Sequence, residues 1–309
     1  IAQERQKKVL VIGDPHLKLL LPDKGNWEIW GYRKGLIWLL QAWRRLCGYQ
    51  FAVAFNCSYQ MRSVHLWLGW LMNAQDKWTF RLSNANRQNV WEEVGSYDLM
   101  TTPMWMRYQS FLDRLSGAEA EGAGGGVKNQ VAYRYDLSWL VASSNRSLAQ
   151  GVVINIQGGS RERTFHLRTV EYLVRQFRKQ GVTVVGLIVT DDNRVLVANH
   201  FKRLDLPVLL NPSSYLPDTI RWVTQFATLV TPDTAWVHIG SALGLEVVVY
   251  YLFDPEAKEI NHSIWRPHGT RFRIYLIPKA HNQVFYEGIL PEHVLRAQEE
   301  GSITEDCIT

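Results

Sequence analysis

The feature that most constrains the fold is a strict alternation of strand-like and helix-like segments across residues 151–253. Short apolar, β-rich runs alternate with segments whose apolar residues recur at helical spacing. The predicted strands are 151–159, 182–189, 207–211, 227–231 and 246–253, and the predicted helices are 168–181, 194–203, 216–226 and one within 230–244. This alternation predicts a doubly wound parallel sheet, in which ligands bind beyond the carboxyl ends of the strands.

The first half is less regular, but it also contains α/β elements. Strands are predicted at 7–12, 51–56 and 78–82, helices at 35–47 and 61–72, an exposed glycine-rich loop at 117–129 and a linker at 136–150. A chain of 309 residues is long for one core, since domains are typically about 100–150 residues. We therefore predict two α/β domains, 1–140 and 141–309, with a cleft between them.

Charge and cysteine content limit the partners and the compartment. A net charge of +5 favours an acidic partner, namely nucleic acid, an anionic membrane surface or a phosphorylated substrate. No nucleic-acid-binding motif or long basic tract is present, so nucleic acid is not expected. Cys47, Cys57 and Cys307 lack metal-ligand spacing and suit free thiols in a reducing compartment. No run reaches the about 18 apolar residues of a membrane span, and no signal-peptide profile appears, so we expect a soluble, cytoplasmic protein.

The stretch QGGSRERTF at 157–165 follows the first strand of the second half. Gly158 and Gly159 allow close backbone approach, Ser160 offers a hydroxyl and Arg163 a cation, so the loop could hold a diphosphate. An ordinary glycine turn with solvated arginines explains the same residues. Asp192, after the next strand, could bind ribose hydroxyls or simply cap a helix. No HExxH-type spacing is present, and no metal is expected.

The stretch TPDTAWVHIG at 231–240 places polar residues where a strand gives way to a helix. Asp233 or Thr234 could cap that helix, and a helix N-terminus at this edge could also bind an anion. His238, about one turn into the helix, could reach the same anion or be a core histidine. Asp14, after the first strand of the chain, could be a general base or a turn residue before proline.

Taken in order, these segments resemble glycosyltransferase family 9, the ADP-heptose:lipopolysaccharide heptosyltransferases. The family pattern Asp-(Ser/Thr)-Gly-x-x-His-(Leu)-x-x-Ala-Leu-Gly is similar to DTAWVHIGSALG, from Asp233 to Gly244. The family's Lys-x-Trp resembles Arg163-Thr164-Phe165. The resemblance covers most of 151–300 and, more loosely, 30–85. Two positions depart from the pattern, because Ala235 and Asp254 stand where the family has glycine. A third departure is that only one helix fits between 7–12 and 51–56, where the family usually has two more βα units.

The resemblance implies a GT-B fold, with two facing Rossmann-like domains. It implies inverting, metal-independent transfer of a heptose from ADP-heptose, without a cofactor, to a lipopolysaccharide core or lipid A acceptor. A peripheral contact with the cytoplasmic face of the inner membrane would suit that acceptor. The alternatives are a GT-B transferase with another nucleotide sugar or a protein acceptor, and a non-catalytic nucleotide- or glycan-binding protein.

The family's functional residues carry over to this chain by position. Asp14 would be the catalytic base, and Asp192 would bind the ribose. The residues expected on the phosphate side are Gly159, Ser160, Arg163, Asp233, Thr234, Ala235 and His238.

Overall fold

A computed structural model describes residues 9–13, 27–31, 36–57, 63–79, 91–93, 102–116, 137, 148–253 and 261–278. The chain divides into two compact units, Ile1–Tyr133 and Arg134–Thr309. The predicted boundary between 140 and 141, the expected loop at 117–129 and most of the expected linker lie outside the described residues.

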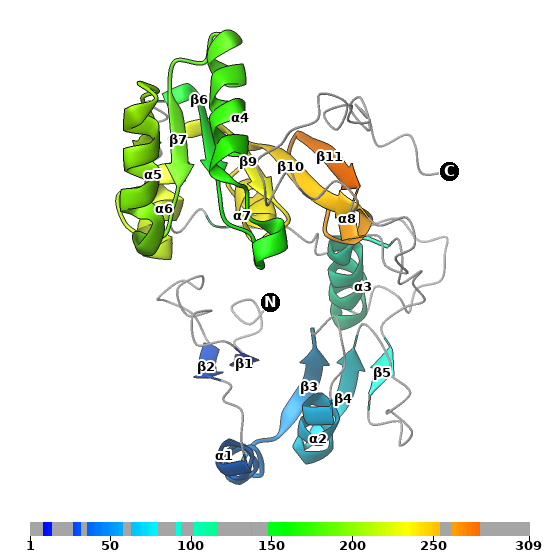
Figure 1. Ribbon diagram of the computed structural model, residues 1–309. Helices are drawn as coiled ribbons and strands as arrows, with labels where there is room; N and C mark the ends of the chain where they lie inside the picture. Colours follow the sequence, from blue (N-terminus) through cyan, green and yellow to red (C-terminus); the bar gives the residue numbers. More distant parts are fainter. Residues whose placement is uncertain are drawn as a thin grey trace, which may run out of the picture. The chain divides into compact units, whose positions relative to one another are not determined.

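The second unit is built on one six-stranded parallel sheet (Figure 1). Its strands are β6 (Leu148–Asn155), β7 (Val185–Ile188), β8 (Leu209–Leu210), β9 (Phe226–Pro232), β10 (Glu246–Phe253) and β11 (Phe272–Pro278). The order across the sheet is β11-β10-β9-β6-β7-β8, and every pairing is parallel. The predicted doubly wound parallel sheet is thereby confirmed.

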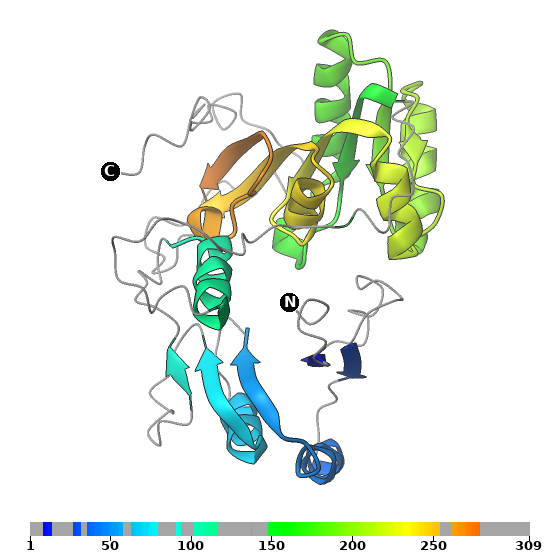
Figure 2. The same cartoon turned by 180° about the vertical axis from the view of Figure 1, so that it is seen from behind.

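Helices cover both faces of this sheet, as Figures 1 and 2 show from opposite sides. They are α4 (Leu167–Lys179), α5 (Asp191–Arg203), α6 (Leu216–Val223), α7 (Trp236–Ala242) and the short α8 (Asn261–Ile264). Successive residues of β6 point to opposite faces: Val152 and Ile154 pack into the core beneath α4 and α5, and Val153 packs into the core that includes α6. These residues are 4% exposed or less, so the fully buried strand explains the continuous apolar run in the sequence.

The structure shifts or adds several elements of this unit relative to the sequence prediction. β6 begins at Leu148, within the expected linker, and ends at Asn155 rather than at residue 159. β8 is only two residues long, and α8 and β11 follow β10 beyond the predicted alternation. The shortening of β6 matters for function, because it leaves the glycines of the 157–165 stretch in a loop at the edge of the sheet.

The described residues of the first unit form two small parallel sheets. The strands are β1 (Val9–Gly13) paired with β2 (Trp27–Gly31), and β3 (Phe51–Asn56), β4 (Ala74–Thr79) and β5 (Glu92–Glu93) in that order; the helices are α1 (Leu36–Leu46), α2 (Ser63–Leu71) and α3 (Met104–Ser116). A core around Trp30, Leu46 and Leu68 joins β2 to α1 and α2. The predicted α1, α2, β1 and β3 are present, whereas the strand predicted at 78–82 lies at 74–79. β2, β5 and α3 were not predicted.

Within the described residues, no helix combines the length and the apolar character needed to cross a membrane.

Candidate functional site

The edge of the second sheet has a topological switch point between β6 and β9. From β6 the chain proceeds through β7 and β8 in one direction, and it then returns to the other side of β6 to form β9, β10 and β11. The loops that follow β6 and β9 therefore leave their strands in diverging directions. In open α/β sheets, this position at the carboxyl ends of the strands is where ligands bind.

A buried polar cluster marks this switch point. The Asn155 side-chain amide, at the end of β6, donates to the Gln157 carbonyl (2.8 Å), to Thr231 Oγ1 (3.0 Å) and to Thr234 Oγ1 (3.4 Å). Thr234 Oγ1 in turn accepts from the backbone N–H of Trp236 at 3.2 Å. Asn155 is 2% exposed and Thr231 is fully buried, so these bonds satisfy groups that would otherwise be costly to bury. The cluster ties the loops after β6 and β9 to each other.

The loop after β6 folds back on itself through Gly158 and Thr164. Thr164 Oγ1 accepts from the N–H of Gly158 at 3.1 Å and donates to the carbonyl of Ser160 at 2.9 Å. A Cβ at Gly158 would lie only 2.0 Å from the carbonyl oxygen of Arg163, so only glycine fits this approach of two backbone segments. The closed loop fixes the backbone position from which the Arg163 side chain extends.

Arg163 spans the switch point and pairs with Asp233. Its Nη1 lies 3.0 Å from Asp233 Oδ2 and also donates to the carbonyl of Asp233 at 3.4 Å, and its Nε donates to Ser160 Oγ at 3.4 Å. The Arg163 side chain is 38% exposed, whereas that of Asp233 is 14% exposed. Burial raises the pKa of Asp233, and the Arg163 guanidinium lowers it by less, so the net shift is upward. Among the described residues Nη2 of Arg163 has no hydrogen-bond partner, which leaves it available to an anionic ligand.

Thr234 and Ala235 have specific places at the start of α7. Ala235 is the N-cap of α7, and the Thr234 hydroxyl just before it accepts from the N–H of Trp236 and also belongs to the buried cluster. Ala235 has φ −56° and ψ −22°, an ordinary helical conformation, so the backbone there does not require the family's glycine. Relative to the glycine of the family pattern, Ala235 therefore adds only a methyl group, and the residue is exposed.

His238 lies one turn into α7, with its ring edge-on to Trp265 at a centroid distance of 6.0 Å. Burial lowers the pKa of His238 to about 4. The imidazole is therefore neutral at pH 7, and it could offer an anion a hydrogen bond but not a positive charge. No bond links it to Arg163 or Asp233.

The lowered pKa of His238 predicts a specific loss of stability in acid. The unfolded chain binds a proton near pH 6.5, whereas the folded protein does so only near 4, so protons favour unfolding between these values. We expect the free energy of unfolding to fall by up to about 3 kcal/mol over this range through His238 alone. Urea denaturation across this pH range measures it. A His238→Gln variant should lose this part of the pH dependence, and an unchanged profile would contradict the assignment.

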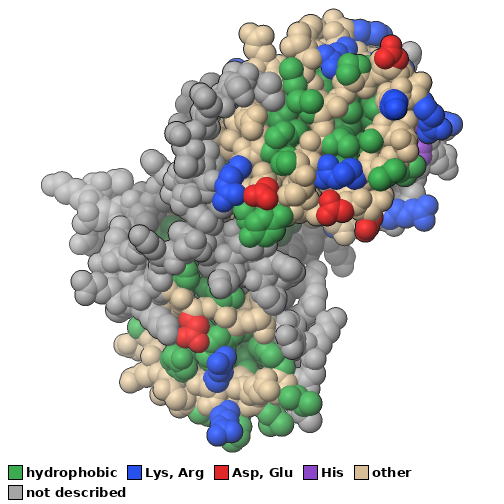
Figure 3. All heavy atoms as spheres, turned by 90° about the vertical axis from the view of Figure 1, so that its left-hand side faces the viewer, with side chains coloured by type: hydrophobic (Ala, Val, Ile, Leu, Met, Phe, Trp, Pro, Cys, Tyr) green, Lys and Arg blue, Asp and Glu red, His purple; other side chains and the backbone are tan. Residues whose placement is uncertain are grey.

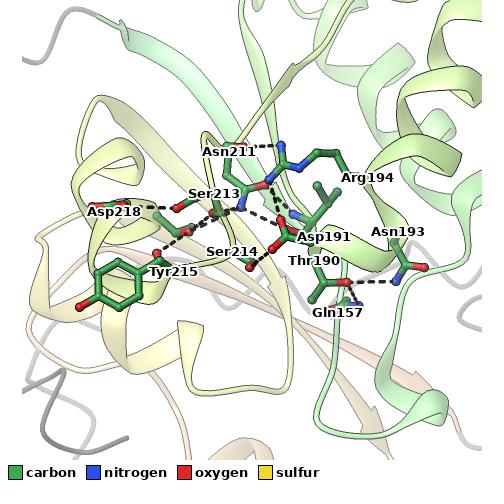
Figure 4. Close-up of polar contacts among 12 residues, drawn as sticks. Gln157, Thr190, Asp191, Asn193, Arg194, Asn211, Ser213, Ser214, Tyr215 and Asp218 are labelled. Atoms are coloured by element: carbon green, nitrogen blue, oxygen red, sulfur yellow. Dashed lines mark hydrogen bonds and ion pairs between the residues drawn. The ribbon is translucent and has the colours of Figure 1, made fainter.

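The loops after β7 and β8 carry a second polar network, drawn in Figure 4. Thr190 Oγ1 accepts from Gln157 Nε2 at 3.1 Å and from Asn193 Nδ2 at 3.4 Å, which links the β6 loop to the start of α5. Asp191, the first residue of α5, accepts from the Ser214 hydroxyl and lies 3.6 Å from Arg194. These contacts fasten three successive loops at the carboxyl edge of the sheet to one another.

Asn211 anchors the β8 loop beneath this network. Its Oδ1 accepts from the N–H of Val189 at 2.9 Å, and its carbonyl accepts from Arg194 Nη1 at 2.6 Å. Asn211 is 1% exposed, so its role is structural. Asp192, predicted at the ribose, is exposed at the start of α5 and is not part of the network in Figure 4.

A pocket of 350 Å³ lies beside the β6 loop, against α5. Apolar walls are combined in it with a few polar side chains, as is usual for small-molecule sites. It is lined by Ile156, Gln157, Arg161, Thr164, Phe165, His166, Leu167, Val189, Asn193, Leu196 and Val197. Gln157 and Thr164 belong both to the pocket wall and to the polar contacts of the switch point, so the pocket and the Arg163–Asp233 pair adjoin one loop.

The structure thus brings together four residues of the predicted set, namely Ser160, Arg163, Asp233 and Thr234. The hydrogen bonds and the ion pair described for these residues do not include Asp192 or His238. Gly159 is adjacent, since a Cβ there would lie 3.1 Å from Arg163 Nη2. Asp14 and Asp254 lie outside the described residues. In the described part of the chain, no three His, Cys, Asp or Glu side chains gather as metal ligands would.

Sequence reasoning missed Asn155 and Thr231, whereas the close backbone approach at Gly158 was predicted. A signal for Asn155 was present, because it is a lone amide in the apolar run GVVINI. A polar residue at the last position of a buried strand marks the edge where the strand emerges.

Comparison with known proteins relates this chain to solved structures rather than to sequences. No family model matches the chain, and no curated protein matches it. The Escherichia coli heptosyltransferase WaaC with ADP superposes with a TM-score of 0.62 at 11% identity, over 93% of this chain and 93% of that one. The family 9 glycosyl transferase of Veillonella parvula gives 0.58 at 12% identity, over 93% and 82%, and the E. coli ADP-heptose LPS heptosyltransferase II gives 0.53 at 12%, over 87% and 82%.

At such low identity the likeness concerns the fold. It agrees with the parallel sheet and the helix layers described above, and it extends over most of both chains. The predicted resemblance is confirmed at this level: the chain has the α/β GT-B fold of glycosyltransferase family 9 structures.

Proposed function

We propose that this protein is an inverting glycosyltransferase that moves a heptose from ADP-heptose to a lipopolysaccharide core acceptor. The observation that carries the proposal is the half-exposed guanidinium of Arg163, held by Asp233 at the switch point of a GT-B sheet. A cation in this place suits a diphosphate, since one guanidinium can donate two parallel hydrogen bonds to phosphate oxygens. Two of the similar structures are of WaaC with ADP and with ADP-2-deoxy-2-fluoro heptose, which supports a nucleotide sugar as donor.

In this proposal the chain's own residues stabilise the leaving group. The acceptor oxygen attacks the anomeric carbon, the bond from that carbon to the diphosphate oxygen breaks, and negative charge grows on ADP. Arg163 and the N–H groups of the Gly159–Ser160 loop would face that charge, with no metal ion or cofactor required. Asp14 would take the proton of the acceptor hydroxyl, an assignment that rests on the family resemblance alone.

The pocket beside the β6 loop gives the nucleoside a place next to the diphosphate. Its 350 Å³ falls in the range of small-molecule sites, about 300–1,000 Å³. Phe165 and Leu196 offer apolar walls for a base. At the start of α5, Asn193 lines the pocket, and Asp192 beside it keeps the proposed ribose role. A lipid-linked acceptor also implies a cytoplasmic protein in peripheral contact with the inner membrane.

A donor screen read by mass spectrometry tests the proposal. Purified protein is incubated with a lipid A–core acceptor and with ADP-heptose or other nucleotide sugars, and the mass gain of the acceptor is measured. We expect one heptose to be added from ADP-heptose, and the Asp14→Asn variant to bind ADP but to transfer nothing.

The other outcomes of the screen separate the alternatives. A mass gain only from another nucleotide sugar, or only on a protein acceptor, would replace the heptose assignment but keep the transferase. Nucleotide binding without turnover on any donor and acceptor would contradict the enzyme and favour a binding protein.

A further inference from the structure

Helix α1 of the first unit exposes large apolar side chains to solvent. Ile37 is 75% exposed, Leu40 52% and Trp43 49%, whereas Ala42 and Leu46 of the same helix are almost fully buried. These three are among only nine large apolar side chains of the described residues that are exposed, and they lie within one eleven-residue helix. Such clustering on a surface marks an interaction site more often than scattered exposed residues do.

The exposed residues share one side of the helix. Ile37, Leu40 and Arg44 are spaced i, i+3 and i+7 and so fall on one face, with Trp43 next to Leu40 on its flank. Leu46 lies on the opposite side, in the core that α1 shares with α2. The helix therefore has two apolar sides, one of which is packed inside the unit while the other is left uncovered.

Arg44 lies on the uncovered side with Arg45 beside it at the end of the helix, and acidic residues are absent from the helix. Arg44 and Arg45 form its last turn, and neither α1 nor α2 contains an Asp or Glu. Arg45 is held in place by stacking on Trp30, with its guanidinium carbon 4.8 Å from the ring centroid. A pocket of 740 Å³ opens beside these arginines, lined by Ile29, Trp30, Gly31, Trp38, Gln41, Ala42, Arg44 and Arg45. Figure 3 shows hydrophobic and basic side chains together at the lower end of this unit.

This combination indicates what covers the helix. Exposed Ile, Leu and Trp with flanking Arg, and without acids, is the pattern of a helix that lies in the interface of an anionic bilayer. Tryptophan prefers that interface because its ring is apolar and its N–H is polar. Trp70, 68% exposed at the end of the neighbouring α2, adds another such side chain. Tryptophan is enriched at protein interfaces too. It is the arginines of α1, together with the lack of any Asp or Glu in α1 and α2, that favour a uniformly anionic bilayer over a protein surface.

We propose that the exposed face of α1 docks the protein on an anionic lipid bilayer, with Ile37, Leu40 and Trp43 inserted and Arg44 at the headgroup phosphates. The docking would bring a lipid-linked acceptor to the first unit, and in this respect the proposal rests on the proposed function. The observations that support the docking, however, all concern residues of the first unit. The test of the docking measures lipid binding rather than sugar transfer.

The test is co-sedimentation of the full chain with vesicles. Vesicles of phosphatidylcholine with added phosphatidylglycerol are compared with vesicles of phosphatidylcholine alone. We expect the wild type to bind the anionic vesicles more tightly, and Ile37→Ser combined with Leu40→Ser to weaken this binding about tenfold or more. Arg44→Gln should weaken it about fivefold and reduce its dependence on salt.

A matched control removes equally exposed apolar residues from the other unit. Val195 is 69% exposed and Leu209 46%, so Val195→Ser combined with Leu209→Ser should leave vesicle binding unchanged. Circular dichroism and thermal melting verify that each variant is folded. The proposal is overturned if the wild type ignores anionic vesicles, or if the folded Ile37/Leu40 variant binds them as well as the wild type. It is also overturned if the wild type is a dimer by sedimentation that this variant converts to a monomer, since α1 would then be covered by a second copy.

Discussion

Replacing Arg163 with alanine is expected to lower kcat/KM for the nucleotide sugar about 100-fold and to raise the donor KM. The guanidinium is the cation that the structure holds at the switch point, and its Nη2 points to no partner among the described residues. Binding to the diphosphate of the bound donor would appear in KM, and the charge that develops on departing ADP would appear in kcat. Steady-state kinetics with varied donor, and isothermal titration with ADP, separate the two effects.

Two further variants make the interpretation specific. Arg163→Lys keeps the charge but cannot contact both Asp233 and Ser160 with one planar group. Its kcat/KM for the nucleotide sugar should therefore be about tenfold below that of the wild type. Arg175→Ala is the matched control, since it removes an arginine in a 2.9 Å ion pair with Glu171 on α4, away from the β6 loop. Unchanged donor kinetics in Arg163→Ala, or an equal loss of kcat/KM in Arg175→Ala, would contradict the phosphate-binding role of Arg163.

The Arg163 variant should remain folded, because the ion pair is partly open to solvent and contributes only about 1 kcal/mol. The carboxylate of Asp233 would lose its partner, however, and its already raised pKa should rise further. A loss of activity that grows as the pH falls would reveal protonation of Asp233. Asp233→Asn should abolish that additional pH dependence.

Much of the second unit follows from its sequence because its strands are buried on both faces. β7 is a continuous apolar run and β9 and β10 are largely apolar, and between them the helices show their own period, so local pattern and tertiary packing agree. β2, with the sequence WEIWG, and the two-residue β5 carry no such pattern. These strands exist because a neighbouring strand pairs with them, which a local pattern cannot reveal.

The candidate site was predictable only in part, for a related reason. Arg163, Asp233 and Thr234 were identified through the order of elements and the family resemblance. The bonds between them join residues far apart in sequence: Arg163 and Asp233 are separated by 70 positions, and Asn155 and Thr231 by 76. Parallel register brings the ends of β6 and β9 side by side, and only the sheet order shows that these two strands are neighbours.

Replacing Gly158 with alanine is expected to disrupt the β6 loop. The new Cβ would lie 2.0 Å from the carbonyl oxygen and 2.3 Å from the carbonyl carbon of Arg163, so one backbone segment must move. Overpacking of this kind costs about 3 kcal/mol, which corresponds to a decrease in Tm of about 6–12 °C for a unit of this size. The movement would also displace the origin of the Arg163 side chain, and the gain in Tm that ADP gives the wild type should disappear.

Gly159→Ala is the paired control, because the same methyl meets a different neighbour one residue later. Its Cβ would lie 3.1 Å from Arg163 Nη2, the end of a flexible side chain that can turn aside. We expect a Tm within about 2 °C of the wild type but a donor KM raised about tenfold, since the guanidinium is displaced. Thermal melting with and without ADP distinguishes the two variants. If Gly158→Ala has the same Tm as the wild type and the same gain in Tm with ADP, the β6 loop does not close on Arg163 as described. The placement of the guanidinium at the switch point would then be wrong as well.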